Sequence, residues 1–361
     1  MPIKRWLRVV SAAALGVGAL TGLAACGSSS TPASSDSTTL RLGYVTTQQH
    51  PYGQAVDFFA KEVATASGGK LKIEGVPSYA GGDVPLLGDV TGGAIPMASV
   101  SAAVFDGKGV NDFEALQMPF LMNRYDLEQS VITGDIGKNM LKGVDKLGLV
   151  GLAIHEGGLR KPLSTGKPIV TLADWKGRKT RSVQSGLLQA GLTALGATPT
   201  PTPVTEIYSS LKSGVVDSAE ANLGLIQSLK LYEQAKYTTL NVNLWPFPTV
   251  LVVNKAAFDK LSADQQKAIT DAATKVPGFS IEIFTKPATN LVTTLCGEGM
   301  KFAFATPEAI GAMAAATKSV SATFGGKDPA VKGYIAQIQA LKDGLPAPKA
   351  ATPPPATCLA K

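Results

Sequence analysis

The 361-residue sequence contains two histidines, three cysteines and only 6% aromatic residues. Histidine is the side chain most often used for acid–base chemistry near neutral pH, so two copies supply that chemistry poorly. Beyond the first 26 residues the chain also lacks a Gly-x-Ser-x-Gly elbow, a Walker loop and a dinucleotide-binding glycine fingerprint. Glu156 follows His155, but the second histidine of a zinc-binding helix is missing. These absences argue against an enzyme, and we expect no metal or other cofactor.

Basic runs are absent after the first few residues, although the formal net charge is +7. Lys4, Arg5 and Arg8 account for three of the 34 basic residues, so the chain from Cys26 onward carries 31 basic and 27 acidic residues, a charge of +4. Without a basic stripe interleaved with aromatic residues, the sequence gives no case for nucleic-acid binding. A content of 45% hydrophobic and 17% charged residues predicts a globular core.

The first 26 residues have the pattern of an export signal, with a basic start and an apolar run of small residues over 9–25. The run ends Leu23-Ala24-Ala25-Cys26, which resembles the bacterial lipobox, whose cysteine becomes the lipid-bearing N-terminus after cleavage. An ordinary signal peptide or a membrane anchor are the alternatives, but the run is short for a span. We expect residues 1–26 to be a lipoprotein signal peptide, Cys26 to be lipidated, and residues 27–39 to be a flexible tether. The protein is then exported and anchored at the outer face of the membrane or in the periplasm.

Two cysteines remain once Cys26 is assigned to a lipid. An exported protein is found where disulfides persist, so we expect a bridge between Cys296 and Cys358. The bridge would fix the C-terminal tail to the body of the protein and contribute roughly 4 kcal/mol in the chain-entropy model. Two free thiols are the alternative.

Alternating strand and helix patterns predict an α/β lobe in the N-terminal half. Strands are expected at 40–45, 71–76 and 95–100, and helices at 54–67 and 83–91. This order favours a largely parallel sheet, in which ligands bind at the carboxyl ends of strands. Those ends are polar and rich in small residues, at 46–50, 78–83 and 99–102.

The rest of the chain predicts a second α/β lobe and a return to the first. A helix is expected at 126–140, a strand at 149–153, a crossing between lobes at 164–174, a returning strand at 249–254, a helix at 261–276 broken by Pro277-Gly278, and a helix at 325–341. Residues 345–357 are rich in Pro and Ala and are expected to be extended.

The segment 174–222 contains an arginine, Arg181, at the predicted end of a short strand. Helical patterns follow at 187–195 and at 206–213, the second ended by Gly214. An arginine placed beside two helices suits a carboxylate, because the guanidinium group offers a planar bidentate fork. The alternative is that Arg181 is a surface charge.

Several motifs make residues 40–320 resemble the DctP-type solute receptors of tripartite ATP-independent periplasmic (TRAP) transporters. They are Met118-Pro119-Phe120-Leu121, Asp174-Trp175-Lys176-Gly177-Arg178-Lys179-Thr180-Arg181, Gly196-Ala197-Thr198-Pro199, Glu206-Ile207-Tyr208, Gly214-Val215-Val216-Asp217 and Leu231-Tyr232-Glu233. The resemblance implies a two-lobe periplasmic-binding-protein fold, with the lobes joined by crossing strands and a long helix around a ligand cleft. It also implies capture of a small organic acid and its delivery to a membrane permease.

On this resemblance, residues 40–163 form mainly lobe 1 and residues 164–248 mainly lobe 2. Residues 249–345 form the return strand, hinge and C-terminal helices, and residues 346–361 form a Pro/Ala-rich tail. We take a monomer as the default. Alternatives are a receptor for an ATP-driven importer, or a sensing or adhesion lipoprotein with the same fold.

The resemblance places Arg181 at the family's ligand-carboxylate arginine. Gln184 and Arg160 match further polar cleft positions, although one extra residue separates the two arginines. Many members have Glu-Asn-Pro after the Val-Asp motif, the asparagine orienting the arginine; here Ala221 intervenes, so either Asn222 takes that role after a small backbone shift or the role is lost. Further candidate ligand contacts are Ser101, Asp83, Trp245 and Phe247, each of which could equally be core packing. Among organic acids, a monoacid or apolar acid is favoured over an amine-bearing one.

Overall fold

The computed structural model describes residues 37–286, 288–347 and 353–360. The expected signal peptide, Cys26 and residues 27–36 lie outside this part of the chain. The first strand begins at Thr38, so Thr38 and Thr39 belong to a sheet and not to a tether. Within the described residues, no helix combines the length and the apolar character needed to cross a membrane.

The first sheet has five strands in the order β2-β1-β3-β10-β4. Their bounds are β1 (Thr38–Gly43), β2 (Leu71–Val76), β3 (Met97–Ser101), β4 (Leu149–His155) and β10 (Thr249–Asn254). β1 pairs in parallel with β2 and β3, as the strand–helix alternation predicts. β10 is antiparallel to both β3 and β4, so the chain returns to this sheet after building the second one.

Seven of the described helices pack against strands of this sheet. They are α1 (Pro51–Ala66), α2 (Asp83–Thr91), α3 (Tyr125–Thr133), α4 (Asp135–Leu141), α8 (Lys255–Asp259), α9 (Ala263–Ala273) and α10 (Val276–Thr285). Every residue of β3 and β10 is buried, which explains their near-continuous apolar sequences. In the edge strand β2, buried Leu71 and Ile73 alternate with exposed Lys72 and Glu74.

Two helix predictions are wrong in detail, each because of one residue. The helix expected at 126–140 is two helices, because Gly134 between α3 and α4 has extended backbone angles of φ −85° and ψ −171°. The break expected at Pro277-Gly278 falls before them, between α9 and α10. Pro277 stands in the first turn of α10, where a helix needs no backbone donor.

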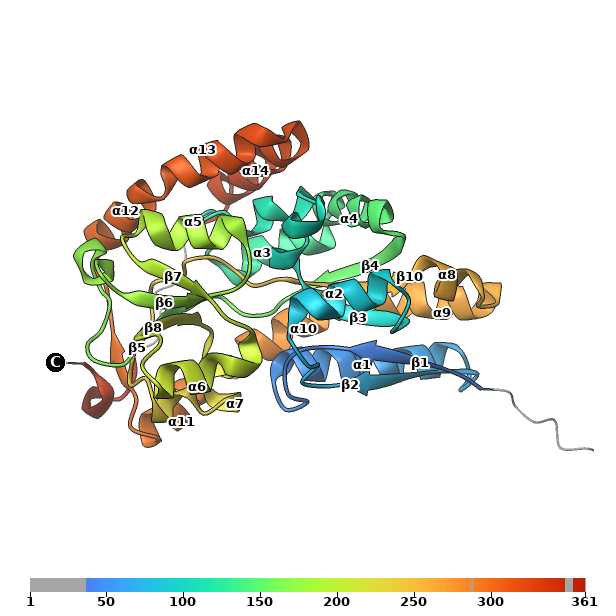
Figure 1. Ribbon diagram of the computed structural model, residues 1–361, viewed down its shortest axis with the longest axis horizontal. Helices are drawn as coiled ribbons and strands as arrows, with labels where there is room; N and C mark the ends of the chain where they lie inside the picture. The colour runs from blue at the N-terminus through green and yellow to red at the C-terminus, as the bar shows by residue number, and fades with distance from the viewer. Residues whose placement is uncertain (1–36, 287, 348–352, 361) are drawn as a thin grey trace, which may run out of the picture. The chain divides into compact units, whose positions relative to one another are not determined.

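The second sheet has six strands in the order β11-β9-β5-β8-β6-β7. Their bounds are β5 (Lys161–Ser164), β6 (Lys179–Ser182), β7 (Thr198–Pro201), β8 (Ser218–Ala221), β9 (Tyr237–Thr239) and β11 (Lys301–Ala303). β6 is parallel to β7 and β8, whereas β5 is antiparallel to β8 and β9. Figure 1 shows α5 (Gly186–Ala194) on one side of β5 to β8, and α6 (Ile207–Lys212), α7 (Leu223–Ser228) and α11 (Ala288–Gly297) on the other.

Three C-terminal helices connect elements of the two sheets. They are α12 (Pro307–Ala316), α13 (Lys318–Lys327) and α14 (Pro329–Asp343), drawn in red in Figure 1. α13 packs on α5 of the second sheet, and α14 packs on α3 and on the 3₁₀ segment Asp112–Gln117 of the first. The expected helix at 325–341 is thus observed as α14, about four residues later at its start.

Two chain segments cross between the sheets and are bonded to each other. One joins β4 to β5 and includes Arg160; the other joins β9 to β10 and includes Leu244 and Trp245. The Arg160 backbone N–H donates to the Trp245 carbonyl at 2.8 Å, and the Leu244 N–H donates to the Arg160 carbonyl at 2.9 Å. These bonds fix the backbone of Arg160 at the junction of the sheets.

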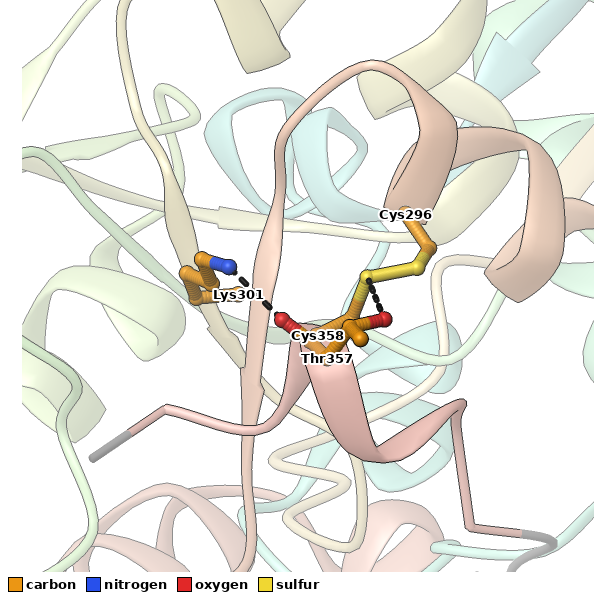
Figure 2. Close-up of a disulfide and its surroundings, with 4 residues drawn as sticks. All are labelled: Cys296, Lys301, Thr357 and Cys358. Atoms are coloured by element: carbon orange, nitrogen blue, oxygen red, sulfur yellow. Dashed lines mark hydrogen bonds between the residues drawn. A yellow bond between two sulfur atoms is a disulfide. The ribbon is translucent and has the colours of Figure 1, made fainter.

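A disulfide joins Cys296, at the end of α11, to Cys358 near the C-terminus (Figure 2). The two Cα atoms are 5.6 Å apart, within the usual range for a bridge. Lys301 of β11 donates from Nζ to the Thr357 carbonyl at 2.8 Å, and Phe302 forms an isolated β-bridge with Leu359. The end of the tail is therefore held against the second sheet by covalent and polar contacts.

Candidate functional site

A cavity of about 20 Å³ lies where elements of the two sheets meet, roughly enough for one water molecule. The first sheet contributes Thr46 and His50, from the segment after β1, and Asp83, at the start of α2. The crossing segment and the second sheet contribute Arg160 and Arg181. The cavity therefore gathers residues from both sheets around two guanidinium groups.

The side chain of Arg181, on β6, donates three hydrogen bonds. Its Nε and Nη2 donate to the Thr202 carbonyl at 2.9 and 2.7 Å, and Nη1 donates to Glu220 Oε1 at 3.0 Å. Only 2% of its surface is exposed. Burial lowers the pKa of Arg181 to about 10, against the opposing effect of Glu220, so the group stays charged at neutral pH.

The second guanidinium, of Arg160, lies on the other side of the same carboxylate. Its Nε is 3.3 Å from Glu220 Oε2, and its guanidinium carbon is 3.9 Å from the centre of the Phe247 ring. Burial lowers its pKa, and the nearby Glu220 opposes this shift. Nη1 is buried and has no hydrogen-bond partner among the described residues. Arg160 therefore keeps donor capacity that Arg181 has partly used.

The charges around the cavity are nearly balanced. Glu220, at 0% exposure, is the carboxylate between Arg160 and Arg181. Asp83 adds a second carboxyl group, whose Oδ1 accepts the Ser101 backbone N–H at 2.8 Å. Burial raises the pKa of Asp83, while that N–H and the two arginines oppose the rise. The site can neutralise one added negative charge more readily than two.

The structure brings five of the eight expected ligand contacts to the cavity and leaves three away from it. The five are Arg181, Arg160, Asn222, Asp83 and Phe247. The three that do not line it are Gln184, Ser101 and Trp245.

Each of the three has a local reason for lying elsewhere. β6 ends at Ser182, and Gln184 in the turn that follows is exposed. Ser101 donates its backbone N–H to Asp83, and its Oγ accepts the Ala103 N–H at 3.2 Å. Trp245 is buried and packs against Gly191 of α5, where a Cβ atom would come within 3.3 Å of the indole ring.

Asn222 lines the cavity, but its amide is used elsewhere than on the key arginine. Its Oδ1 accepts the Leu225 N–H at 2.7 Å and so caps α7, and its Nδ2 donates to the Gly157 carbonyl at 2.7 Å. Arg181 is oriented instead by Glu220 and Thr202. Of the two alternatives left open by the sequence, this geometry fits the one in which the orienting role of the asparagine is lost.

Four residues of the site had no expected role in the sequence. Thr46 and His50 lie in a polar strand end that was named only as a range, while Glu220 and Thr202 were not singled out as partners of Arg181. The signal for Glu220 was its place in the motif before Asn222. The signal for His50 was its position before Pro51, because a polar residue before proline often begins a helix.

No group of three or more His, Cys, Asp or Glu residues in the described chain is placed to hold a metal ion. The polar groups that line the cavity are two arginines, one carboxyl group, one histidine and hydroxyl or amide groups. This set suits an anion with hydrogen-bonding oxygen atoms.

Comparison with known proteins gives a family and related structures. Residues 42–327 match the model of the family DctP, bacterial extracellular solute-binding protein, family 7. The 2,3-diketo-L-gulonate-binding periplasmic protein YiaO of Escherichia coli is 29% identical over 78% of this chain and 83% of its own length. The C4-dicarboxylate-binding periplasmic protein DctP of Rhodobacter capsulatus is 30% identical over 71% of this chain and 77% of its own.

A solved structure with the same architecture is a TRAP periplasmic solute-binding protein from Polaromonas sp. JS666 bound to D-erythronate. It superposes with a TM-score of 0.79 at 28% sequence identity, covering 84% of this chain and 99% of its own. The two-sheet α/β fold of the present chain is thus shared with a receptor whose bound ligand is an organic acid.

Proposed function

The chain belongs to the DctP family of bacterial extracellular solute-binding proteins, and from that premise we propose that it captures a small organic acid between its two sheets and delivers it to a TRAP-type membrane permease. The observation that supports this most directly is the pair of buried arginines in one cavity. The carboxylates bound or named for YiaO, DctP and the Polaromonas protein support the same ligand class.

The geometry gives a physical reason for carboxylate capture. A buried carboxylate is costly unless it is paired and hydrogen-bonded. Arg160 has a buried Nη1 without a partner, and Arg181 has used three of its five N–H donors on Thr202 and Glu220. A charge-assisted hydrogen bond contributes about 1.5–3 kcal/mol net, so closure of the two lobes must supply further contacts.

Transport also fits the sequence better than catalysis, and the family is one of receptors. We therefore propose no catalytic residue. The ATP-driven importer and the sensing or adhesion lipoprotein remain alternatives, and the family match favours the TRAP permease as partner. We retain a monomer as the proposed state. The expected lobe bounds of 40–163 and 164–248 need correction, because β5 (Lys161–Ser164) belongs to the second sheet and β10 (Thr249–Asn254) to the first. We therefore propose that the hinge lies in the two crossing segments, between β4 and β5 and between β9 and β10.

The proposed location is outside the cytoplasmic membrane, with a lipid on Cys26. The support is the sequence Leu23-Ala24-Ala25-Cys26 after an apolar run and before a Ser-rich segment. Mass spectrometry of the mature N-terminal peptide tests this, because a free or internal Cys26 would contradict the anchor.

The first experiment is thermal melting of the mature chain with a panel of small organic acids. A ligand at 100 times its dissociation constant stabilises the folded state by about 2.7 kcal/mol, enough to shift the melting temperature by several degrees. We expect Arg181→Lys to lose most of the affinity, because lysine cannot form the planar fork.

Arg178→Lys is the matched control, because Arg178 bonds the Asp174 and Lys167 carbonyls and does not line the cavity. It should bind the same acid as the wild type does. Binding by Arg181→Lys at the wild-type level would remove Arg181 from the central role. A folded wild type that neither responds to any acid nor contains one by native mass spectrometry would contradict the proposed function.

A further inference from the structure

Two neutral side chains of the cavity have buried polar atoms without hydrogen-bond partners. Thr46 is 6% exposed and His50 is 1% exposed, and both line the cavity. Neither Thr46 Oγ1 nor His50 Nε2 forms a hydrogen bond of ordinary geometry with any described residue, although Asn222 lies beside His50. Buried polar groups are rarely left unpaired, so these two atoms point to a missing acceptor or donor in the cavity.

The surroundings of His50 fix it as a donor. Its Nδ1 accepts the Tyr52 backbone N–H at 3.1 Å at the beginning of α1. Burial, with a contribution from Arg160, lowers its pKa to about 3, so the ring is neutral near neutral pH. A neutral ring whose Nδ1 accepts must hold its proton on Nε2. The Thr46 hydroxyl can also donate, so the cavity offers two uncharged donors.

Arg160 and Arg181 cannot neutralise a second carboxylate of the ligand as well as the first. Arg181 already binds Glu220 and the Thr202 carbonyl, and Arg160 shares Glu220. Asp83 adds a further carboxyl group on the first-sheet side. A second ligand carboxylate would face carboxylates and neutral donors, whereas a hydroxyl or keto oxygen would meet donors without added charge.

Resting on the proposed function, we propose that Thr46 and His50 form a neutral donor subsite that selects monocarboxylates with a hydroxyl or keto oxygen close to the carboxylate. The oxygen is expected close to the carboxylate because Thr46, His50 and the two arginines line the same cavity. Unsubstituted acids leave the two donors unpaired, and dicarboxylates bring a second charge to them.

The test uses four-carbon acids, so that chain length stays constant. The probes are butanoate, 2-hydroxybutanoate, 2-oxobutanoate, D-erythronate and succinate, titrated by calorimetry into the mature chain. We expect the three hydroxyl- or keto-bearing monoacids to bind more tightly than butanoate and succinate. Succinate binding more tightly than all three would overturn the proposal.

Two variants remove the donors with little change of shape or fold. Thr46→Val is isosteric, and His50→Asn retains a residue type that caps helices well while withdrawing the distal N–H. Each should weaken binding of 2-hydroxybutanoate or 2-oxobutanoate roughly three- to tenfold more than it weakens binding of butanoate. Thr91→Val is the matched control, because Thr91 Oγ1 is also buried without a partner but lies outside the cavity lining.

The outcomes separate this proposal from the one on which it rests. One outcome is that the acids bind the wild type and bind Arg181→Lys more weakly, while the affinity depends neither on the 2-oxygen nor on Thr46→Val or His50→Asn. In that case the receptor function stands and the donor subsite is wrong. Equal losses for butanoate and its 2-oxygen analogues in Thr46→Val and His50→Asn would also overturn it, since they would indicate a structural effect. If no acid binds the folded wild type, the proposed function fails and the subsite with it.

Discussion

At the residue scale, the Glu220 carboxylate allows the guanidinium groups of Arg160 and Arg181 to be buried side by side. One carboxylate oxygen is 3.0 Å from Arg181 Nη1 and the other is 3.3 Å from Arg160 Nε. All three side chains are at most 4% exposed. Without the carboxylate, two positive charges would face each other in a medium that screens them poorly.

We therefore predict that Glu220→Gln lowers the free energy of unfolding by about 3–5 kcal/mol, the usual cost of breaking a buried ion pair from one side. Urea unfolding at neutral pH measures it. Asp271→Asn is the control, because its pair with Lys267 is exposed (side chains 54% and 73% exposed) and should cost less than about 1 kcal/mol. Equal small effects in the two variants would show that Glu220 does not hold the arginines together.

The arginines could be predicted from sequence, but most of their partners could not. Arg181 stands in a long motif that marks its position, and Arg160 has a weaker one. Contacts such as the one between Arg181 and the Thr202 carbonyl depend on the register of β6 against β7, which no local pattern specifies. Gln184 was expected in the cavity because it follows Arg181 by three residues. β6 ends at Ser182, and that spacing does not indicate where the strand ends.

At the scale of elements, the disulfide joins a short segment near the C-terminus to α11. Cys358 lies in a three-residue 3₁₀ turn, Ala356–Cys358, and Cys296 lies in α11, 62 residues earlier. The residues around the bridge add a few polar contacts, such as Lys301 Nζ to the Thr357 carbonyl. Residues 353–360 are therefore held by the covalent bond together with a few polar contacts.

We predict that replacing Cys296 and Cys358 together by serine lowers the free energy of unfolding by about 2–5 kcal/mol. The reason is that a bridge restricts the unfolded chain over the loop that it closes. Urea unfolding with and without a reductant measures the effect, and the reduced wild type should match the variant. Two free thiols in the native wild type, or an unchanged unfolding midpoint in the variant, would contradict the bridge.

Elements with strong patterns are the ones that the sequence predicted well. β2, α2 and β10 have the expected bounds, because glycines precede β2 and flank α2 and because β10 is an almost continuous apolar run. The helix expected at 126–140 failed at Gly134, because helical periodicity continues across a residue whose backbone can leave the helix. Pairing between distant strands, such as β11 with β9, has no local signal.

At the scale of the whole described chain, the site depends on how the two sheets meet. The cavity is lined from both sheets and holds about 20 Å³, which is too small for an organic acid such as D-erythronate. The crossing segment is also tightly packed, since a Cβ atom on Gly157 would lie 2.0 Å from the Phe247 carbonyl oxygen. Ligand entry therefore requires the sheets to separate, and capture requires them to approach again around the ligand.

This motion can be measured as a distance between exposed residues of the two sheets. Lys72 is on β2 and Lys179 is on β6, and both are exposed. Spin labels on Lys72→Cys and Lys179→Cys should show a broad distance distribution without ligand and a shorter, narrower one with a bound acid, because only the closed arrangement gains the ligand's contacts with both sides.

A label pair on Lys72→Cys and Asp145→Cys is the control, because both positions are exposed and belong to elements of the first sheet and its connections. Its distance should not change when the acid binds. If the Lys72–Lys179 distance also stays constant while calorimetry shows binding, the acid enters without separation of the sheets. The cavity between Arg160 and Arg181 would then be too small to be its site, and the binding site would have to lie elsewhere on the chain.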